Sequence, residues 1–239
     1  MKLDILIFAA HPDDAELSMG GTIARFTAEG LKAGIVDLTK GEMSTRGNTE
    51  IRSKETGAAT RILKIKVREN LGLKDGNISL SKNALKKVVI KIRKYKPSIV
   101  FAPYLNDRHP DHIDASILVK RAVFSSGLKE YNTISAGKAQ FHYRPEKIFY
   151  YMQTYLFSPS FIVDISNYFN TKMKAVKAFK SQFHDAKSKE EDTFISRPEF
   201  LDYVEARAKF YGFQIRKKYG EPFYCEEAIN YNFSDLLKN

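Results

Sequence analysis

The chain has 239 residues, which at roughly 150 residues per domain corresponds to one large domain or to a domain with an extension. It is 43% hydrophobic and 28% charged, with 13 Tyr and 17 Phe, and this composition excludes a disordered, collagen-like or low-complexity chain. The net charge of +11 suits either an anionic small substrate or nucleic acid, so charge alone does not identify the partner.

Cysteine content and hydropathy bear on the location of the protein. The single cysteine, Cys225, excludes an internal disulfide and a cysteine-rich zinc site. We therefore expect a reducing, cytoplasmic location, and we expect any bound metal to use His and carboxylate ligands. The apolar run within residues 1–10 is too short for a membrane-spanning helix and has no signal-peptide pattern, and polar residues interrupt the stretch 148–163. We expect no membrane span.

Strands and helices are predicted to alternate through the first 128 residues. The apolar run Leu3–Ala10 is typical of a strand that is buried on both faces. The elements predicted after it are a helix over Ala15–Glu29, a strand over Ala33–Thr39, a helix over Glu50–Leu63, a strand over Val67–Leu71, a helix over Lys82–Tyr95, a strand over Ser98–Ala102 and a helix over Ala115–Phe124. Gly20-Gly21 inside the first helix predicts the close approach of another backbone.

The alternation weakens after Lys129. We predict strands over Lys147–Gln153 and Phe161–Ile165, helices over Asn167–Gln182 and Pro198–Tyr211, and an irregular C-terminal extension. No segment is long enough for an interdomain linker. The sequence therefore predicts a single α/β domain over 1–239, in which residues 1–128 form the core and 129–239 complete the fold. Its sheet should be mostly parallel, with helices on both faces.

The stretch Lys82–Lys96 contains seven Lys or Arg residues and no acidic residue. Apolar residues recur at helical spacing between these charges, which favours the solvated face of an amphipathic helix. A nucleic-acid stripe is the weaker interpretation, because neither a stacking aromatic pattern nor a helix-turn-helix signature accompanies the charges. We expect no nucleic-acid partner.

Two histidine motifs follow two of the predicted strands. His11-Pro-Asp13-Asp14 follows the first strand, and His109-Pro-Asp111-His112 follows the strand over Ser98–Ala102. Taken singly, such motifs are often only turns or helix caps. Because ligands bind beyond the carboxyl ends of the strands in open α/β sheets, the two motifs should converge on one site. Imidazole and carboxylate groups are ligands for Zn²⁺ or a similar divalent ion such as Fe²⁺.

Spacing suggests a role for each residue of the first motif. Residues i and i+3 share one face of a forming helix, so His11 and Asp14 can bind one ion while Asp13 points elsewhere. Asp13 is then free to act as a general base. With a third ligand from the second motif, a zinc site keeps one open position, where the pKa of water falls to about 7.

The same spacing separates the residues of the second motif. His112 can join the ligands, while His109 faces the space where a carbonyl oxygen would develop negative charge. Oriented by Asp111, a protonated His109 would stabilise that oxygen or protonate the leaving amine.

The segment Ala10–Glu16, paired with residues 109–112, resembles the PIG-L/LmbE-like family of metal-dependent N-acetylglucosaminyl deacetylases, whose fold is Rossmann-like. The resemblance covers most of the chain and also includes Asp37-Leu38-Thr39, the region Arg52–Glu55, Lys96 to Pro103, Arg108 and Ser181-Gln182-Phe183. It is closest to the bacillithiol biosynthesis deacetylases, which convert N-acetylglucosaminyl-malate into glucosaminyl-malate and acetate. A closed homo-oligomer is also implied.

The resemblance implies the same roles as the residue spacing. It makes His11, Asp14 and His112 the zinc ligands, Asp13 the general base and His109 the electrostatic and acid partner. One departure lies near Phe200, where some relatives place a tyrosine that can touch the oxyanion.

Arg52 and Arg108 are candidate substrate-binding residues. Either can be solvated, or paired with Glu55 or Asp107. A malate aglycone carries two carboxylates that suit guanidinium forks, so the resemblance implies both arginines as anion clamps.

Two classes of alternative function stay open. The enzyme can instead deacetylate another N-acetylated sugar or a chitooligosaccharide. A non-catalytic sugar- or nucleic-acid-binding protein is less favoured, because a binding module needs no spare carboxylate such as Asp13 beside its ligands.

Overall fold

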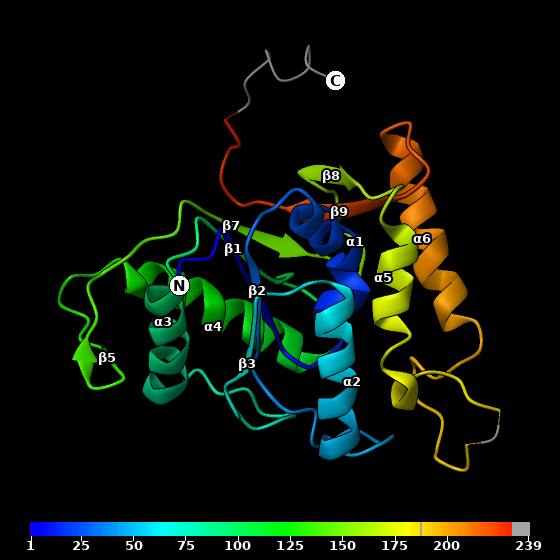
Figure 1. Ribbon diagram of the computed structural model, residues 1–239, viewed down its shortest axis with the longest axis horizontal. Coiled ribbons are helices and arrows are strands. Elements are labelled where there is room, and N and C mark those ends of the chain that lie inside the picture. Colours follow the sequence, from blue (N-terminus) through cyan, green and yellow to red (C-terminus); the bar gives the residue numbers. More distant parts are fainter. Residues whose placement is uncertain (187, 231–239) are drawn as a thin grey trace.

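The structure is a computed structural model that describes residues 1–186 and 188–230. Seven strands form one sheet in the order β3-β2-β1-β4-β7-β9-β8 (Figure 1). They are β1 (Ile5–Ala9), β2 (Ala33–Asp37), β3 (Val67–Asn70), β4 (Ile99–Pro103), β7 (Lys147–Tyr151), β8 (Phe161–Asp164) and β9 (Gly220–Tyr224), and β5 (Ile134–Ser135) pairs with β6 (Lys138–Ala139) in a separate hairpin. The helices are α1 (Asp14–Ala28), α2 (Thr49–Ile62), α3 (Lys82–Tyr95), α4 (Pro110–Ser126), α5 (Phe169–Val176) and α6 (Phe200–Gln214), with a 3₁₀ turn, η1, at Lys180–Gln182.

Helices cover both faces of the sheet, and each face has its own core. Alternate residues of β1 point to opposite faces, so Leu6 and Phe8 pack with α3 and α4, while Ile5 and Ile7 pack with the other helices. The strands from β3 across to β7 are parallel, whereas β9 runs antiparallel to both its neighbours. The predicted α/β fold with a mostly parallel sheet is therefore confirmed.

The strand order reverses between β1 and β4. From β1 the chain continues outward to β2 and β3, and β4 then starts on the other side of β1. In open α/β sheets such a switch point leaves a crevice at the carboxyl ends of the two strands, and ligands bind there. Both histidine motifs follow these two strands, so the topology brings them together.

The predicted irregular extension contains a strand. Within the part of the extension that the structure describes, β9 inserts between β7 and β8. Gly220 and Pro222 are poor strand formers, and for this reason the sequence pattern did not predict it. Residues 231–239 of the extension lie outside the described residues.

The helix predicted over Asn167–Gln182 is divided into α5 and η1. Glu55 of α2 accepts hydrogen bonds from the backbone N–H of Ser181 at 2.7 Å and from its hydroxyl at 2.8 Å. Because this N–H bonds to Glu55 instead of an earlier carbonyl, the α-helix does not continue through it.

Gly20 and Gly21 of α1 lie against side chains and not, as expected, chiefly against another backbone. A Cβ on Gly21 would lie 2.7 Å from Cδ1 of Ile165, and a Cβ on Gly20 would lie 3.2 Å from Cγ of Lys172. The two glycines therefore let α5 and the residues before it pack closely on α1.

A buried carboxylate of β9 holds the second half of α1. The helix is irregular at Met19, and Glu221 accepts hydrogen bonds from the backbone N–H groups of Gly21 at 3.0 Å and Thr22 at 2.6 Å. Lys172 of α5 lies 2.6 Å from the same carboxylate, and both charged side chains are 2% exposed. A buried charge must be paired, so this group ties α1, α5 and β9 together.

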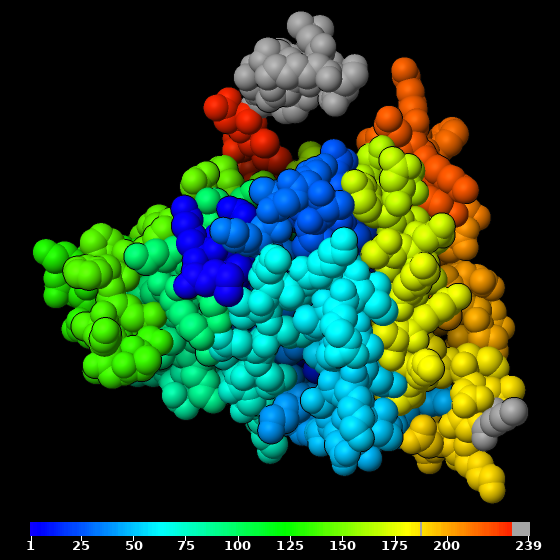
Figure 2. All heavy atoms as spheres, in the orientation of Figure 1, coloured from blue at the N-terminus to red at the C-terminus, as the bar shows by residue number. Residues whose placement is uncertain are grey.

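The C-terminal helices form one flank of the molecule. In Figure 2 the yellow residues of α5 lie beside the blue and cyan surface of α1 and α2, and the orange residues of α6 lie on the outer side of the yellow ones. On the opposite face, α3 buries Val88, Val89 and Ile92, while Lys91 and Lys94 pair with Glu69, as the amphipathic interpretation predicts. No helix within the described residues has the length and apolar character that a membrane crossing requires.

Candidate active site

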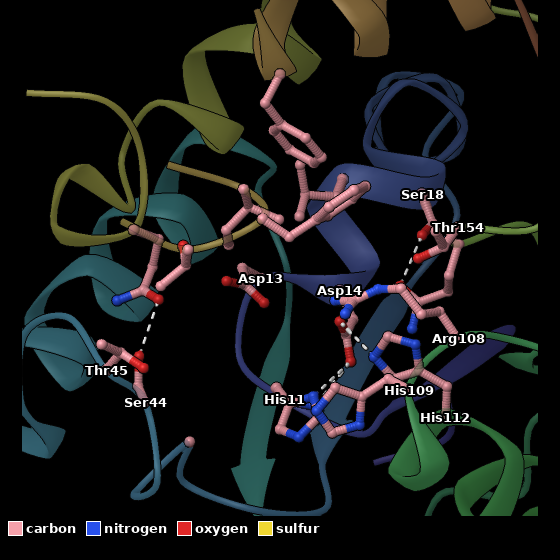
Figure 3. Close-up of a pocket in the computed structure, with 18 of the residues that line it drawn as sticks. His11, Asp13, Asp14, Ser18, Ser44, Thr45, Arg108, His109, His112 and Thr154 are labelled. Carbon is pink, nitrogen blue, oxygen red and sulfur yellow. Dashed lines mark hydrogen bonds and ion pairs between the residues drawn. The ribbon is translucent and has the colours of Figure 1, made fainter. Parts of the chain in front are cut away.

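A cavity of about 470 Å³ lies at the carboxyl ends of β1 and β4, within the usual size range of small-ligand pockets. Both histidine motifs line it, together with the loop after β2, the segment after β7, residues 193–195 and α6. Figure 3 shows His11, Asp14, His109 and His112 gathered on one side, with Asp13 set apart from them. The convergence expected from the strand ends is thus present.

The three predicted ligands surround one point. Candidate ligand atoms of His11, Asp14 and His112 all lie within 4.8 Å of one another. Nε2 of His112 is 3.3 Å from Asp14 Oδ1, and Nδ1 of His11 is 3.5 Å from Asp14 Oδ2. Two imidazoles and one carboxylate at this spacing fit a divalent ion such as zinc.

Asp107 fixes the orientation of His112. Its carboxylate lies 2.8 Å from His112 Nδ1 and also accepts backbone N–H groups from His109 and Thr154. Burial raises the pKa of Asp107, but these hydrogen bonds lower it to about 2, so the group is charged. The proton of the neutral imidazole is then held on Nδ1, and Nε2 is left free to bind an ion. From the sequence, Asp107 is expected only as a partner of Arg108.

Two further carboxylates support His11. Its Nε2 lies 3.0 Å from Asp75 Oδ1 and 3.3 Å from Asp111 Oδ2. Asp75 follows β3 and is buried, and no motif in the sequence indicated it. His11, His109 and Asp111 form a second group of possible ligands. The first group fits better, since the Asp111 carboxylate already accepts the backbone N–H groups of Gly76 and Ile78.

Opposite charges shift the pKa values of the ligand group. Burial lowers the pKa of His112, but Asp14 and Asp107 outweigh it and raise the value to about 9. Burial raises the pKa of Asp14, yet His112 and His11 hold it well below its usual range. Because a ligand imidazole must be neutral, an ion has to displace the proton of His112, and metal affinity should rise with pH.

Asp13 occupies a strained backbone conformation. Its φ is 124°, a region that side-chain-bearing residues rarely adopt, and α1 begins only at Asp14. His11 therefore precedes the helix. This strained turn, and not the i,i+3 face that we expected, brings His11 to Asp14. Burial raises the pKa of Asp13 to about 7, with Arg52 opposing the rise, and this value suits a general base near neutrality.

The two predicted anion clamps differ in their surroundings. Arg52 is buried, and its Nη1 donates to Asp13 Oδ2 at 3.0 Å and to the carbonyl of Pro12 at 2.6 Å. Arg108 is exposed, lines the cavity and lies 4.7 Å from the centre of the Phe194 ring. Arg52 thus serves the candidate base, whereas Arg108 has no carboxylate partner among the described residues.

His109 is held by a backbone group. Its Nδ1 accepts the N–H of Asp111 at 3.2 Å, which places the proton of the neutral ring on Nε2. Burial lowers the pKa of His109, and the neighbouring His11 and His112 lower it further. The sequence predicts a protonated His109 oriented by Asp111. The geometry instead favours a neutral donor that the Asp111 backbone orients, while the carboxylate of Asp111 serves His11.

The first turn of α6 adds aromatic groups to the cavity. Phe200 lines it, and Tyr203, one helical turn later, lines it too and is 39% exposed. Residues three apart on a helix share a face, so the spacing from Phe200 could have indicated from the sequence that Tyr203 lines the cavity. The cavity therefore has a hydroxyl-bearing ring although position 200 is phenylalanine.

Known proteins are similar to this chain in sequence and in fold. The family described as "GlcNAc-PI de-N-acetylase" (PIG-L) matches residues 6–123, which include both histidine motifs. The chain is 30% identical over 189 residues to the diacetylchitobiose deacetylase of Thermococcus kodakarensis, covering 75% of this chain and 70% of that protein. It is 28% identical over 192 residues to a probable N-acetyl-alpha-D-glucosaminyl L-malate deacetylase 2 of Bacillus anthracis, covering 75% and 81%.

Among solved structures, the conserved protein TT1542 from Thermus thermophilus superposes with a TM-score of 0.87 at 38% identity. The match covers 96% of this chain and 97% of that one. The agreement extends well beyond the residues that carry the motifs. The chain therefore belongs to the PIG-L family and is a deacetylase.

Proposed function

We propose that the protein is a zinc-dependent hydrolase that removes the acetyl group from an N-acetylglucosamine conjugate. N-acetylglucosaminyl-malate, the substrate in bacillithiol biosynthesis, is our first choice. One observation carries the proposal: the cavity brings the group of His11, Asp14 and His112 together with a separate carboxylate, Asp13, whose pKa is raised to about 7. A site that only bound metal or sugar would not need this second group.

A zinc ion held by the three ligands would supply Lewis acidity and hydroxide near neutral pH. Asp13 accepts the proton of the attacking water and returns it to the nitrogen of the leaving amine, since a pKa near 7 allows both transfers. His109 donates its Nε2–H to the oxygen that becomes negative. Arg52 holds Asp13 in its strained conformation throughout these steps.

A carboxylate-bearing conjugate suits the charge of the cavity. Three arginines line it, Arg52, Arg108 and one on α6, against three aspartates, and a divalent ion would leave a surplus of positive charge. The malate deacetylase named among the relatives supports the same choice.

A neutral chitooligosaccharide is the second candidate substrate. It is favoured by the 30% identity to a diacetylchitobiose deacetylase and by a cavity of about 470 Å³, which has room beyond the sugar ring next to the metal ligands.

Acetate release from a panel of substrates tests the proposal. The metal-loaded protein would be assayed with N-acetylglucosaminyl-malate, diacetylchitobiose and free N-acetylglucosamine, with Asp13→Asn as the matched inactive control. We expect the malate conjugate to give the highest kcat/KM. A preference for diacetylchitobiose would select the second candidate, and release from none of the three would refute the proposed function.

We also propose a cytoplasmic homo-oligomer. The buried free thiol of Cys225 suits a reducing compartment. Phe124 of α4, Ile134 of β5 and Phe141 after β6 expose 59%, 63% and 83% of their surface. A second copy of the chain would cover such apolar groups. Light scattering of the purified protein measures the oligomeric state, and a monomer at micromolar concentration would contradict this part.

A further inference from the structure

We infer that Arg207 of α6, with Gln153 beside it, is the part of the cavity interior that recognises a carboxylate on the substrate. The inference rests on the proposed function, because it concerns how that site chooses among N-acetylglucosamine conjugates. It assigns the recognition of negative charge inside the cavity to a residue that no motif indicated.

Arg52 is a poor candidate for this task. Its guanidinium is buried against Asp13, the carbonyl of Pro12 and the hydroxyl of Ser44. A carboxylate that drew Arg52 away would leave Asp13 buried without its counter-charge, and this would oppose binding.

Arg207 lines the same cavity, but unlike Arg52 it is not paired with the candidate base. Its guanidinium donates to the carbonyls of Gln153 and Leu17 and lies 5.6 Å from the centre of the Tyr203 ring. No carboxylate within the described part of the chain forms an ion pair with it. Carbonyl dipoles and an aromatic face orient the group but leave its charge unneutralised, so an anion in the cavity is its natural partner.

Gln153 presents a second free donor at the same place. Its Oε1 accepts the hydroxyl of Ser18 at 3.2 Å, which fixes the amide, and its Nε2 is buried without a hydrogen-bond partner among the described residues. A buried donor left unpaired costs free energy, so a substrate oxygen that accepts from it would bind more tightly.

These groups form a corner next to the metal ligands. Ser18 lies one helical turn after Asp14 on α1, and Thr154, which follows Gln153, donates its N–H to Asp107 behind His112. In Figure 3 Ser18 and Thr154 lie on the side of Arg108, opposite Ser44 and Thr45. A carboxylate has two oxygens, one for the Arg207 guanidinium and one for the Gln153 amide, whereas a neutral sugar hydroxyl leaves the charge of Arg207 unpaired.

A binding measurement tests this without depending on turnover. In an Asp13→Asn background, calorimetry would give the Kd of the metal-loaded protein for N-acetylglucosaminyl-malate and for the neutral methyl N-acetylglucosaminide. Arg207→Gln should reduce the preference for the malate conjugate by roughly 10- to 100-fold, the scale of a charge-assisted hydrogen bond. Arg207→Lys should recover part of it, and Gln153→Glu, which places a carboxylate against a carboxylate, should also lower it.

Lys209→Gln is the matched control, because it removes a positive charge from the same helix at a residue that pairs with Glu205 outside the cavity lining. It should leave the preference unchanged. The inference is refuted if Arg207→Gln keeps the preference, if Lys209→Gln reduces it equally, or if the parent protein has none. Should Arg207→Gln fail to fold, Arg207→Lys and Gln153→Glu decide. Absence of acetate release by the wild-type protein is a separate result that refutes the proposed function.

Discussion

The tripeptide His-Pro-Asp occurs twice in this molecule, after β1 and after β4, and the two copies differ in where the following helix begins. After β1 the helix begins at Asp14, and Asp13 is left outside it with φ at 124°. After β4 the helix begins at Pro110, with His109 as an extended N-terminal cap at φ −89°. The same three residues therefore place their aspartates in different surroundings.

This difference separates the tasks of the two aspartates. Asp13 faces the cavity and Arg52, where it can accept and return a proton. Asp111 lies in the first turn of α4, where backbone N–H groups and His11 surround its carboxylate. The start of the helix, and not the motif itself, determines which aspartate is the candidate base.

The largest loss of activity should come from removing one of the proposed metal ligands, which the two His-Pro-Asp motifs supply together. His112→Ala or Asp14→Ala should abolish stoichiometric zinc binding and reduce acetate release to background, because each removes one of three ligands. Elemental analysis and the acetate assay measure this, with the exposed His142→Ala as control. Full metal occupancy in both variants would place the ion elsewhere.

Replacing Asp13 and replacing Asp111 should have different effects on zinc binding and on activity. Asp13→Asn should keep zinc and lose activity by roughly 10²- to 10⁴-fold, the usual scale for a general base. Asp111→Asn should weaken zinc binding by roughly 10- to 100-fold through His11, and excess zinc should restore much of its activity. Metal titrations of both variants make the comparison. Rescue of Asp13→Asn by zinc would contradict the assignment.

His109, the N-terminal cap of α4, should stabilise only the transition state and should not contribute to substrate or zinc binding. His109→Ala should lower kcat by roughly 10²-fold, as expected for the loss of one oxyanion donor, while KM and zinc content change little. Steady-state kinetics provide the test. A rise in KM with kcat intact would make His109 a substrate-binding residue instead.

The pH dependence of kcat/KM tests the proposed role of Asp13 directly. Asp13 acts as a base only as a carboxylate, and its pKa is raised to about 7, so kcat/KM should fall about tenfold per pH unit on the acid side. A bound divalent ion favours the carboxylate, so this limb should lie at or below pH 7. If the residual activity of Asp13→Asn keeps the same acid limb, the limb belongs to another group.

The smallest expected effects on activity concern the two cavity arginines, Arg52 and Arg108. Arg52→Gln should lower kcat for neutral and carboxylate-bearing substrates alike, because it releases Asp13. Arg108→Gln should cost roughly tenfold in kcat/KM, and mainly for the carboxylate-bearing conjugate, since an exposed charge contributes modestly. Equal losses on both substrates in Arg108→Gln would remove it from substrate recognition.

The sequence predicted the parts of the site that lie at strand ends. A buried apolar run followed by a polar motif locates His11 and His112 well, because parallel strands put their carboxyl ends together. Asp107 lies five positions before His112 but was considered only as a partner of Arg108. Asp75 was not predicted, since only the tertiary fold makes it a partner of His11. Asp75 stands 64 positions from His11, and no local pattern relates the two.

The C-terminal contributions were harder to predict for a similar reason. β9 contains Gly220 and Pro222, so its short strand is formed by pairing with β7 and β8 and not by local preference. Arg207 faces the cavity only because α6 packs on β9 and β8 in the completed fold. Periodicity alone could locate α6 but not what it faces.

The contact between Glu221 and α1 has a consequence for synthesis on the ribosome. The carboxylate meets a backbone N–H 200 residues earlier in the chain, so the helix that begins with Asp14 cannot be fixed until β9 has emerged. Until then the edge of β7 lacks its neighbour, and an open strand edge invites pairing with other chains. A nascent chain that ends before Gly220 should therefore aggregate, and its complete set of catalytic motifs should remain without activity.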